Sequence, residues 1–219
     1  MSVATENFIK AIYNLGRKHE GDTKPGSIAS FLNISNAAAT DMAKNLSKKN
    51  LVNYEKYKEL KLTKEGELLA LRIVRKHRLW EALLFKLFNM SLHEIHIEAE
   101  LLEHQTSDFL AQKMDEYLGF PKYDPHGDPI PDVNGIIHTE DHSIVLLNAE
   151  EGKKYQISRL VSVDKDFFDF CAENGLNNGA EIEVVKQYEK NKMTQIKVAE
   201  NILLLNNDFT KIIYVNEKN

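Results

Sequence analysis

Residues 24–50, KPGSIASFLNISNAAATDMAKNLSKKN, decide the fold of the N-terminal part of this 219-residue chain. Pro25 and Gly26 break the chain, and the apolar residues that follow them predict a short helix. Ser35 is a good N-cap for a second helix. The apolar side of that helix consists of Ala39, Met42, Ala43 and Leu46. The stretch therefore predicts two consecutive helices with a turn between them.

The flanking residues extend this pattern on both sides. Residues 3–18 have the spacing of an amphipathic helix, with Phe8 and Ile12 on one apolar stripe. Two strand-like runs, 51–56 and 60–63, follow the helices and predict a β-hairpin. A helix, a helix-turn-helix and a hairpin, in this order, predict a winged helix-turn-helix.

The distribution of charge supports a nucleic-acid partner for this part of the chain. The whole chain has a net charge of −5, but residues 1–75 hold 13 Lys/Arg and 8 Asp/Glu, a net charge of +5. The remaining residues hold 15 Lys/Arg and 25 Asp/Glu, a net charge of −10. This asymmetry predicts a basic module joined to acidic ones.

The second helix of the quoted stretch begins with small residues, which suits a recognition helix. Ala37 and Ala38 allow its first turn to approach base edges and thymine methyl groups. Only Asn36 offers an amide or guanidinium at the expected reading positions, so DNA shape has to supply much of the specificity. The residues predicted to contact base edges, phosphates or the groove beside the wing are Ser35, Asn36, Ala37, Ala38, Thr40, Asp41, Lys44, Lys56, Tyr57, Lys58 and Lys61.

Bulk composition limits the cellular location. Cys171 is the only cysteine, so an intrachain disulfide is impossible and a reducing cytoplasm is expected. The first ten residues, MSVATENFIK, lack the pattern of a signal peptide. No run approaches the roughly 18 apolar residues of a membrane helix, so we expect no membrane partner.

A second functional signal lies in residues 93–108, HEIHIEAELLEHQTSD. On a helix that advances about 100° per residue, with His96 at zero, Glu103 lies near about −20°, Glu100 near about +40° and His104 near about +80°. Aliphatic residues border this polar stripe on both sides, so we expect it to face protein. A divalent cation would offset the cost of burying its carboxylates.

The preceding helical pattern, residues 63–88, adds two more potential ligands. His77 and Glu81 are four residues apart and share a helix face. The two consecutive helices thus offer six imidazole or carboxylate ligands, enough for two metal sites per subunit. Without a thiolate, this set suits Mn²⁺ or Fe²⁺ better than copper or a structural zinc.

Two other interpretations of these residues stay open. The first is a metal-dependent enzyme, but HEIHI has Ile97 where a zincin motif requires its second histidine. The absence of an evident nucleophile or base favours sensing, so we predict no enzyme activity and no small-molecule substrate. The second is a metal-independent winged-helix regulator in which the His/Glu faces form only ion pairs.

The C-terminal third changes character. Residues 120–142 contain four of the five prolines and predict an ordered loop that leads to a linker. The residues after it form short β-runs with one short helix around 166–173. The expected fold class is therefore mainly α with a small β domain, a β-barrel.

The segments ENFIKAIYNL (6–15), RKHRLWE (75–81), HIEAELLEH (96–104) and FPKYDPHGDPIP (120–131) together resemble the diphtheria toxin repressor family of metal-dependent transcription regulators, in particular its manganese-responsive three-domain branch. The resemblance spans essentially the whole chain. It implies a winged helix-turn-helix DNA-binding domain (1–72), a helical metal-binding and dimerisation domain (73–142) and an SH3-like domain (143–219). It also implies a repressor of manganese or iron uptake genes that binds a palindromic operator as a homodimer.

The resemblance implies two ligand sets. The ancillary set is His77, Glu81, His96 and, from the SH3-like domain, Asp164. The primary set is Glu100, Glu103 and His104. Glu100 stands where iron-type members carry cysteine, so the resemblance favours Mn²⁺, with Fe²⁺ as the alternative. Asp124 stands where some manganese-type relatives place a cysteine ligand.

The first helix departs from the family pattern at two positions. Asn7 stands where manganese-type members have aspartate, and an amide oxygen is a weaker, neutral donor. Lys10 replaces a glutamate of the two-domain manganese regulators. Asp124 is expected to restore negative charge to the primary site.

The end of the 63–88 helix is too apolar for one buried stripe, which predicts a dimer interface on part of it. We expect metal to fix the relative positions of the ligand-bearing segments and so to favour the conformer that fits DNA. The residues predicted for the interface are Trp80, Leu83, Leu84, Phe85, Leu87 and Phe88.

Overall fold

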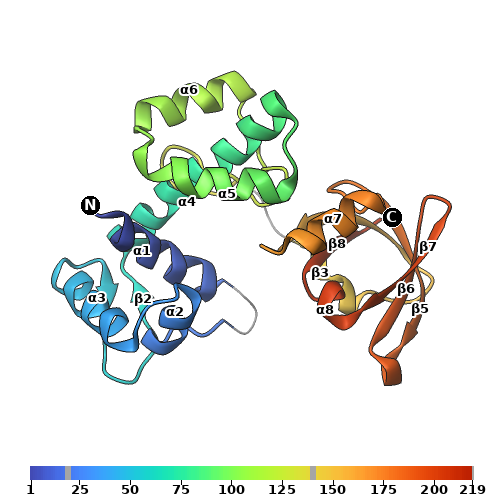
Figure 1. Cartoon of the computed structure of the whole chain (residues 1–219), viewed down its shortest axis with the longest axis horizontal. Helices are drawn as coiled ribbons and strands as arrows, with labels where there is room; N and C mark the ends of the chain where they lie inside the picture. Colours follow the sequence, from blue (N-terminus) through green and yellow to red (C-terminus); the bar gives the residue numbers. More distant parts are fainter. Residues whose placement is uncertain (18–20, 139–141, 219) are drawn as a thin grey trace. The chain divides into compact units, whose positions relative to one another are not determined.

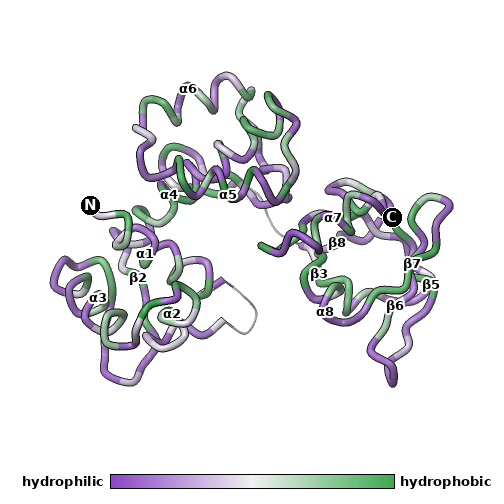
Figure 2. The backbone as a smooth tube through the Cα atoms, in the orientation of Figure 1, coloured by the Kyte–Doolittle hydropathy of each residue, from purple (hydrophilic) through white to green (hydrophobic). Residues whose placement is uncertain are grey.

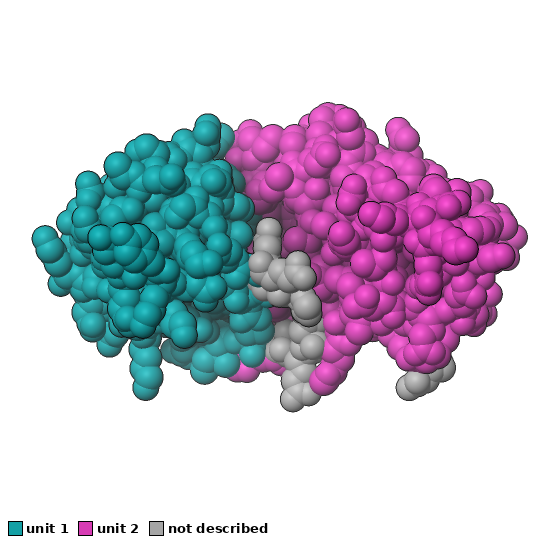
Figure 3. All heavy atoms as spheres, turned by 90° about the horizontal axis from the view of Figure 1, so that it is seen from below, with its two compact units in different colours: residues 1–77, 100–113, 131–137 teal, residues 78–99, 114–130, 138–219 magenta. Residues whose placement is uncertain are grey.

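The computed structural model describes residues 1–17, 21–138 and 142–218 (Figure 1). The described chain forms two compact units, coloured separately in Figure 3. The first unit comprises residues 1–77, 100–113 and 131–137, and the second comprises residues 78–99, 114–130 and 138–219. Three helices contribute residues to both units.

The first unit contains the winged helix-turn-helix. Its helices are α1 (Val3–Gly16), α2 (Pro25–Phe31) and α3 (Asn36–Lys48), and the wing strands β1 (Val52–Asn53) and β2 (Lys61–Leu62) pair antiparallel. Residue 18, which the predicted first helix includes, lies outside the described residues. The wing strands are shorter than the predicted runs.

Local chemistry explains the start of α3. Ser35 has extended backbone, and its Oγ accepts a hydrogen bond from the Ala38 N–H at 3.1 Å, so the predicted N-cap is confirmed. Ala39, Ala43 and Leu46 of α3 are buried against Phe8 and the rest of the first unit's core. Since the apolar sides of α1, α2 and α3 all face this core, the opposite side of α3 lies in solvent.

Three further helices follow the wing. They are α4 (Lys64–Phe88), α5 (Leu92–Leu102) and α6 (Asp108–Leu118), and a 3₁₀ turn, Glu103–Gln105, separates the last two. The predicted helix over residues 93–108 thus ends at Leu102, and a new helix begins at Asp108. Thr106 Oγ1 donates to the Leu102 carbonyl at 2.7 Å, and the tighter 3₁₀ turn satisfies carbonyls at the helix end. Glu103 and His104 therefore lie in a 3₁₀ turn and not in the α-helix for which their angular positions were predicted.

The C-terminal part of the second unit is a six-stranded antiparallel sheet in the order β3-β8-β4-β5-β6-β7. Phe167 and Cys171 of its helix pack on Ile157 and other inward-facing strand residues. The predicted β-runs and the short helix are confirmed. The elements are β3 (Ile144–Val145), β4 (Lys154–Leu160), α7 (Lys165–Glu173), β5 (Glu181–Tyr188), β6 (Met193–Val198), β7 (Asn201–Asn206), α8 (Asn207–Thr210) and β8 (Ile213–Glu217).

Hydrophobic and hydrophilic residues are interspersed along the helices and strands, as the backbone colouring in Figure 2 shows. Among the residues that the structure describes, no helix combines the length and apolar character needed to cross a membrane. The helices instead bury one side each.

The proline-rich loop after α6 is ordered where it is described. Tyr123 and Pro129 form an isolated antiparallel bridge, and the Gly127 N–H donates to the Asp124 carbonyl at 3.1 Å. Residues 139–141 of the predicted loop and linker lie outside the described residues. The loop between the bridging residues brings polar side chains to α4.

Candidate metal centre

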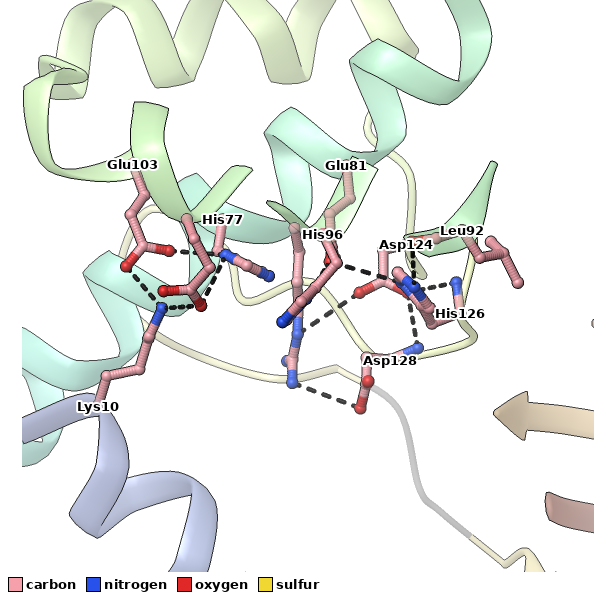
Figure 4. Close-up of polar contacts among 11 residues, drawn as sticks. Lys10, His77, Glu81, Leu92, His96, Glu103, Asp124, His126 and Asp128 are labelled. Carbon is pink, nitrogen blue, oxygen red and sulfur yellow. Dashed lines mark hydrogen bonds and ion pairs between the residues drawn. The ribbon is translucent and has the colours of Figure 1, made fainter. Parts of the chain in front are cut away.

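The second unit contains a buried cluster of two carboxylates and an imidazole. Glu81 projects from α4, and Asp124 and His126 come from the proline-rich loop (Figure 4). Glu81, Asp124 and His126 are 2%, 4% and 5% exposed, respectively. One potential ligand atom from each residue lies within 4.8 Å of those of the other two. Such burial of two carboxylates is costly unless cations or donors compensate them.

Backbone N–H groups of the loop hold the Asp124 carboxylate in place. Asp124 Oδ1 accepts from the N–H groups of His126 at 2.9 Å and Asp128 at 3.0 Å. Its second oxygen lies 3.7 Å from Arg78 Nε on α4, and Arg78 also donates to the Pro129 carbonyl. The position of the carboxylate is therefore fixed by both the loop and α4.

Gly127 allows the loop to approach the β-sheet. Its φ is +93°, and a Cβ at this position would lie 1.9 Å from the Ser158 carbonyl oxygen on β4. The His126 carbonyl accepts from the Leu160 N–H at 2.9 Å, and the His126 ring lies 5.3 Å from that of Phe168. Only glycine fits this close backbone contact without strain.

The hydrogen bonds of His126 determine which ring nitrogen faces the carboxylates. Nε2 lies 3.1 Å from the Leu92 carbonyl oxygen, which can only accept, so Nε2 carries the proton. Nδ1 then faces Glu81 Oε1 at 3.5 Å. A neutral ring would direct its Nδ1 lone pair at a carboxylate, so a cation, either a proton or a metal ion, is required there.

The electrostatics of the cluster lead to the same conclusion. Burial raises the pKa of Asp124 well above its usual range, and the negative charges of Glu81 and Asp128 raise it further. Burial lowers the pKa of His126, but attraction and hydrogen bonding to Glu81 outweigh it and raise that pKa to about 9. The Asp124 carboxyl and the His126 ring therefore hold protons that a metal ion would displace.

His96 of α5 adds a second imidazole to this cluster. Its Nδ1 lies 3.1 Å from Glu81 Oε1, and its ring lies 6.2 Å from that of His126 at nearly a right angle. Oxygen and imidazole nitrogen are ligands that suit Mn²⁺ and Fe²⁺. The donor set and its buried, unbalanced charge fit a divalent cation.

Two of the predicted ligands have other partners in this structure. Asp164 is exposed and caps α7, with its Oδ1 accepting from the Asp166 N–H at 2.9 Å. Asp124 was expected beside Glu100, Glu103 and His104, but the structure groups it with Glu81 and His126. The loop geometry around Gly127 is the physical reason for this placement.

The first unit holds a second polar cluster, around the 3₁₀ turn. Glu103 is 1% exposed, and its Oε2 lies 2.7 Å from Nδ1 of His77 on α4 (Figure 4). His104 Nδ1 lies 2.7 Å from Glu6 Oε2 on α1. His77 was predicted with Glu81 and His96, and here its hydrogen bond goes to a residue of the predicted primary set.

Lys10 of α1 occupies the centre of this cluster. Its Nζ lies 2.6 Å from Glu100 Oε1 and 2.6 Å from Glu103 Oε1. Asn7, one turn earlier on α1, has a buried Oδ1 without a hydrogen-bond partner among the described residues. The predicted primary ligands are thus brought together, but an ammonium group lies between two of the carboxylates.

The predicted DNA-contacting residues lie on one exposed part of the first unit. All of them are exposed except Thr40, which is half-buried. Tyr57 at the wing tip is 83% exposed with a φ of +67°, and Lys56 Nζ lies 4.8 Å from its ring centroid. Three members are in ion pairs: Lys44 and Asp41 pair with each other at 3.4 Å, and Lys58 pairs with Glu55 at 2.5 Å.

Sequence reasoning missed His126 and Glu6. His126 lies in a loop, where no helical periodicity marks a functional side chain, although it follows the candidate Asp124 by two residues. Glu6 lies one residue before Asn7, so the register of the first helix could have indicated it. Neither the contact of His126 with Glu81 nor that of Glu6 with His104 could be assigned without the fold.

Known protein families match all three parts of the chain. Residues 1–60 match the iron dependent repressor N-terminal DNA binding domain, residues 63–132 match the iron dependent repressor metal binding and dimerisation domain, and residues 144–217 match the FeoA domain. The diphtheria toxin repressor of Corynebacterium efficiens is 28% identical over 193 residues, which cover 84% of this chain and 83% of that protein.

Solved structures agree with this match. A manganese-dependent transcriptional repressor in complex with manganese has a TM-score of 0.91 at 26% identity, with 98% of this chain and 100% of that chain covered. The structure of ScaR with bound Cd²⁺ has a TM-score of 0.83 at 31% identity, with 98% and 99% covered.

A winged helix joined to a helical metal-binding and dimerisation domain defines a class, the metal-dependent transcription regulators, which are not enzymes. The fold, the buried cluster and the matches place this chain in that class. The chain belongs to the diphtheria toxin repressor family.

Proposed function

We propose that this protein is a repressor of manganese or iron uptake genes, active in the cytoplasm as a homodimer on a palindromic operator. A divalent ion, Mn²⁺ in preference to Fe²⁺, is its activating ligand. Glu81, Asp124, His126 and His96 hold the ion, and Asp164 remains a candidate fifth ligand. The observation that carries this proposal is the buried pair of carboxylates that face an imidazole Nδ1.

The residues of the cluster connect several elements of the second unit. Glu81 lies on α4 and His96 on α5, while Gly127 and Leu160 tie the loop to β4. A bound divalent ion supplies two positive charges that neutralise Glu81 and Asp124. The protein residues then keep α4, α5 and the loop in one arrangement, because each element contributes a ligand.

Regulation requires that the metal-bound arrangement of α4, α5 and the loop bind DNA with a different affinity from the arrangements adopted without metal. Coupling between metal and operator is limited by the difference in metal affinity between conformers, typically about 1–3 kcal/mol. In the operator complex, the first turn of α3 faces base edges, and Lys56, Tyr57, Lys58 and Lys61 of the wing face the backbone. A homodimer places two such helices on two half-sites.

Binding of an operator fragment, measured by fluorescence anisotropy, tests this function. Mn²⁺ and Fe²⁺ are each titrated against a chelated sample, with Zn²⁺ as a third metal. We expect metal to raise operator affinity about 5–150-fold. His126→Ala should remove the stimulation, whereas the control His138→Ala, at an exposed histidine, should retain it.

Equal operator affinity with metal and with chelator would contradict the proposal. That result would instead support a metal-independent winged-helix regulator. Full stimulation in His126→Ala would show that metal acts, but at another site.

A further inference from the structure

In the first unit, the ammonium group of Lys10 lies between two carboxylates. Lys10 is 8% exposed, and its Nζ makes equal 2.6 Å contacts to Glu100 Oε1 and Glu103 Oε1 (Figure 4). The Glu103 side chain is completely buried, and the Glu100 side chain is 37% exposed. Burial of an ammonium group is costly unless carboxylates compensate its charge, and Glu100 and Glu103 supply that compensation to Lys10.

The ammonium uses the oxygens that a metal ion would need. A divalent ion binds carboxylate oxygens at about 2.0–2.6 Å, and the Oε1 atoms of Glu100 and Glu103 already accept from Lys10. The remaining Glu103 oxygen is engaged at 2.7 Å by His77 Nδ1. A divalent ion at these oxygens would lie a few ångströms from a positive charge, and this repulsion opposes its binding.

Two other atoms of the first unit are potential metal ligands. Asn7 Oδ1 and His104 Nε2 are buried and lack hydrogen-bond partners among the described residues. His104 Nε2 lies 3.2 Å from Glu103 Oε1, the same oxygen that accepts from Lys10. Potential metal ligands therefore remain in this part of the first unit, and the Lys10 ammonium is the charge that opposes a divalent ion there.

We propose that Lys10 is a built-in cation that replaces a metal ion at the Glu100–Glu103 cluster. It joins α1 of the DNA-binding part to the turn after α5 by a permanent link, so this junction does not depend on metal. The chain then responds to metal only through the Glu81–Asp124–His126 cluster. This inference concerns the site that the proposed function does not use, and the two can fail independently.

Manganese stoichiometry tests the replacement. Purified dimeric protein is dialysed against excess Mn²⁺, and bound metal is counted by mass spectrometry for the wild type and for Lys10→Met. Removal of the ammonium leaves two carboxylates and the Asn7 and His104 donors, so we expect the variant to bind more metal by about one ion per chain. This additional metal binding is expected whether or not a metal ion occupies the Glu81–Asp124–His126 cluster.

Lys153→Met is the matched control. Lys153 also bridges two carboxylates, Glu150 at 3.1 Å and Glu217 at 3.0 Å, but its side chain is 36% exposed. Without burial or neighbouring imidazoles, the two surface carboxylates should not acquire a manganese ion in the variant. An increment confined to Lys10→Met therefore supports the proposal.

Unchanged stoichiometry in folded Lys10→Met, checked by circular dichroism, would overturn the proposal. A second measurement does not depend on the folding of that variant. Glu103→Gln in an otherwise wild-type chain should leave the metal count unaltered, because the wild-type cluster binds none. A loss of about one ion per chain in Glu103→Gln would show that metal binds there despite Lys10.

Discussion

At the scale of single residues, the metal affinity of the centre depends on the protons that Asp124 and His126 hold. Both groups are buried beside Glu81, and both have a raised pKa, His126 to about 9. The Leu92 carbonyl fixes the protonated nitrogen of His126, and backbone N–H groups fix one oxygen of Asp124. A metal ion competes with protons for the atoms that remain.

This competition predicts a pH-dependent metal affinity. The His126 pKa lies near 9, so below that pH a metal ion must displace the ring proton. Affinity for Mn²⁺ should therefore rise with pH, by about tenfold per unit for one displaced proton, between about pH 6.5 and 8.5. Calorimetric titrations across this range measure the slope, and a flat dependence would contradict the predicted role of His126.

Gly127 gives a second prediction at the residue scale. Gly127→Ala places a Cβ 1.9 Å from the Ser158 carbonyl at a φ of +93°. We expect the free energy of unfolding to fall by more than about 1 kcal/mol, and metal affinity to fall because Asp124 and His126 flank the glycine.

Gly152→Ala is the control for this effect. Its φ of +78° has the same strain, but its Cβ would meet nothing within 4 Å. Denaturant unfolding of both variants separates the backbone clash from the effect of φ alone. Equal losses of stability would show that the contact with Ser158 does not hold the loop.

At the scale of elements, amphipathic spacing and capping made most helices predictable. Ser35 and the apolar side of α3 marked its position, and leucines recurring at helical spacing marked α4 through Phe88. The two-residue strand β3 and the one-turn helix α8 are too short to show any period. The 3₁₀ turn at Glu103 was also hidden, because helical and 3₁₀ residues share the same local sequence preferences.

The functional sites were predictable only in part for a related reason. Glu81, His96 and Glu103 stood out because they recur on helix faces, whereas His126 lies in a loop. Lys10 was visible as a departure from the family pattern, but its ion pairs join residues 90 and 93 positions apart. Contacts at that separation follow from the tertiary fold and from no local pattern.

The wing provides a prediction at the element scale. Lys61 begins β2 on the exposed side of the wing, so Lys61→Ala should weaken operator binding by a similar factor for all DNA sequences. The slope of log affinity against log salt should fall by about 1, as for one lost phosphate contact. Anisotropy titrations at several salt concentrations measure it, with the exposed Lys211→Ala as control. An unaltered slope would remove Lys61 from the interface.

At the scale of the whole molecule, exposed apolar residues at the end of α4 are consistent with the predicted dimer interface. Phe85, Leu87 and Phe88 at the end of α4 are 45%, 49% and 66% exposed, while Leu84 of the same predicted set is buried. The matched family domain that contains them is a dimerisation domain. An apolar cluster of this kind on the surface is typical of an interaction site.

Disruption of this surface should dissociate the dimer. Phe88→Asp places a charge in the proposed interface, and we expect the dimer dissociation constant to rise at least about tenfold, or about 1.4 kcal/mol. Sedimentation equilibrium measures it. Val133→Asp, at a residue that is 62% exposed in the first unit, should leave the constant unchanged. A dimer of unaltered strength in Phe88→Asp would place the interface elsewhere.

The most direct test of the metal centre is a crystal of the manganese-loaded protein, with anomalous diffraction recorded at the manganese edge. We predict a peak bounded by the carboxylates of Glu81 and Asp124 and by Nδ1 of His126, and none between Glu100 and Glu103. A peak at Glu103 with none at Glu81 would contradict both the proposed metal centre and the role given to Lys10.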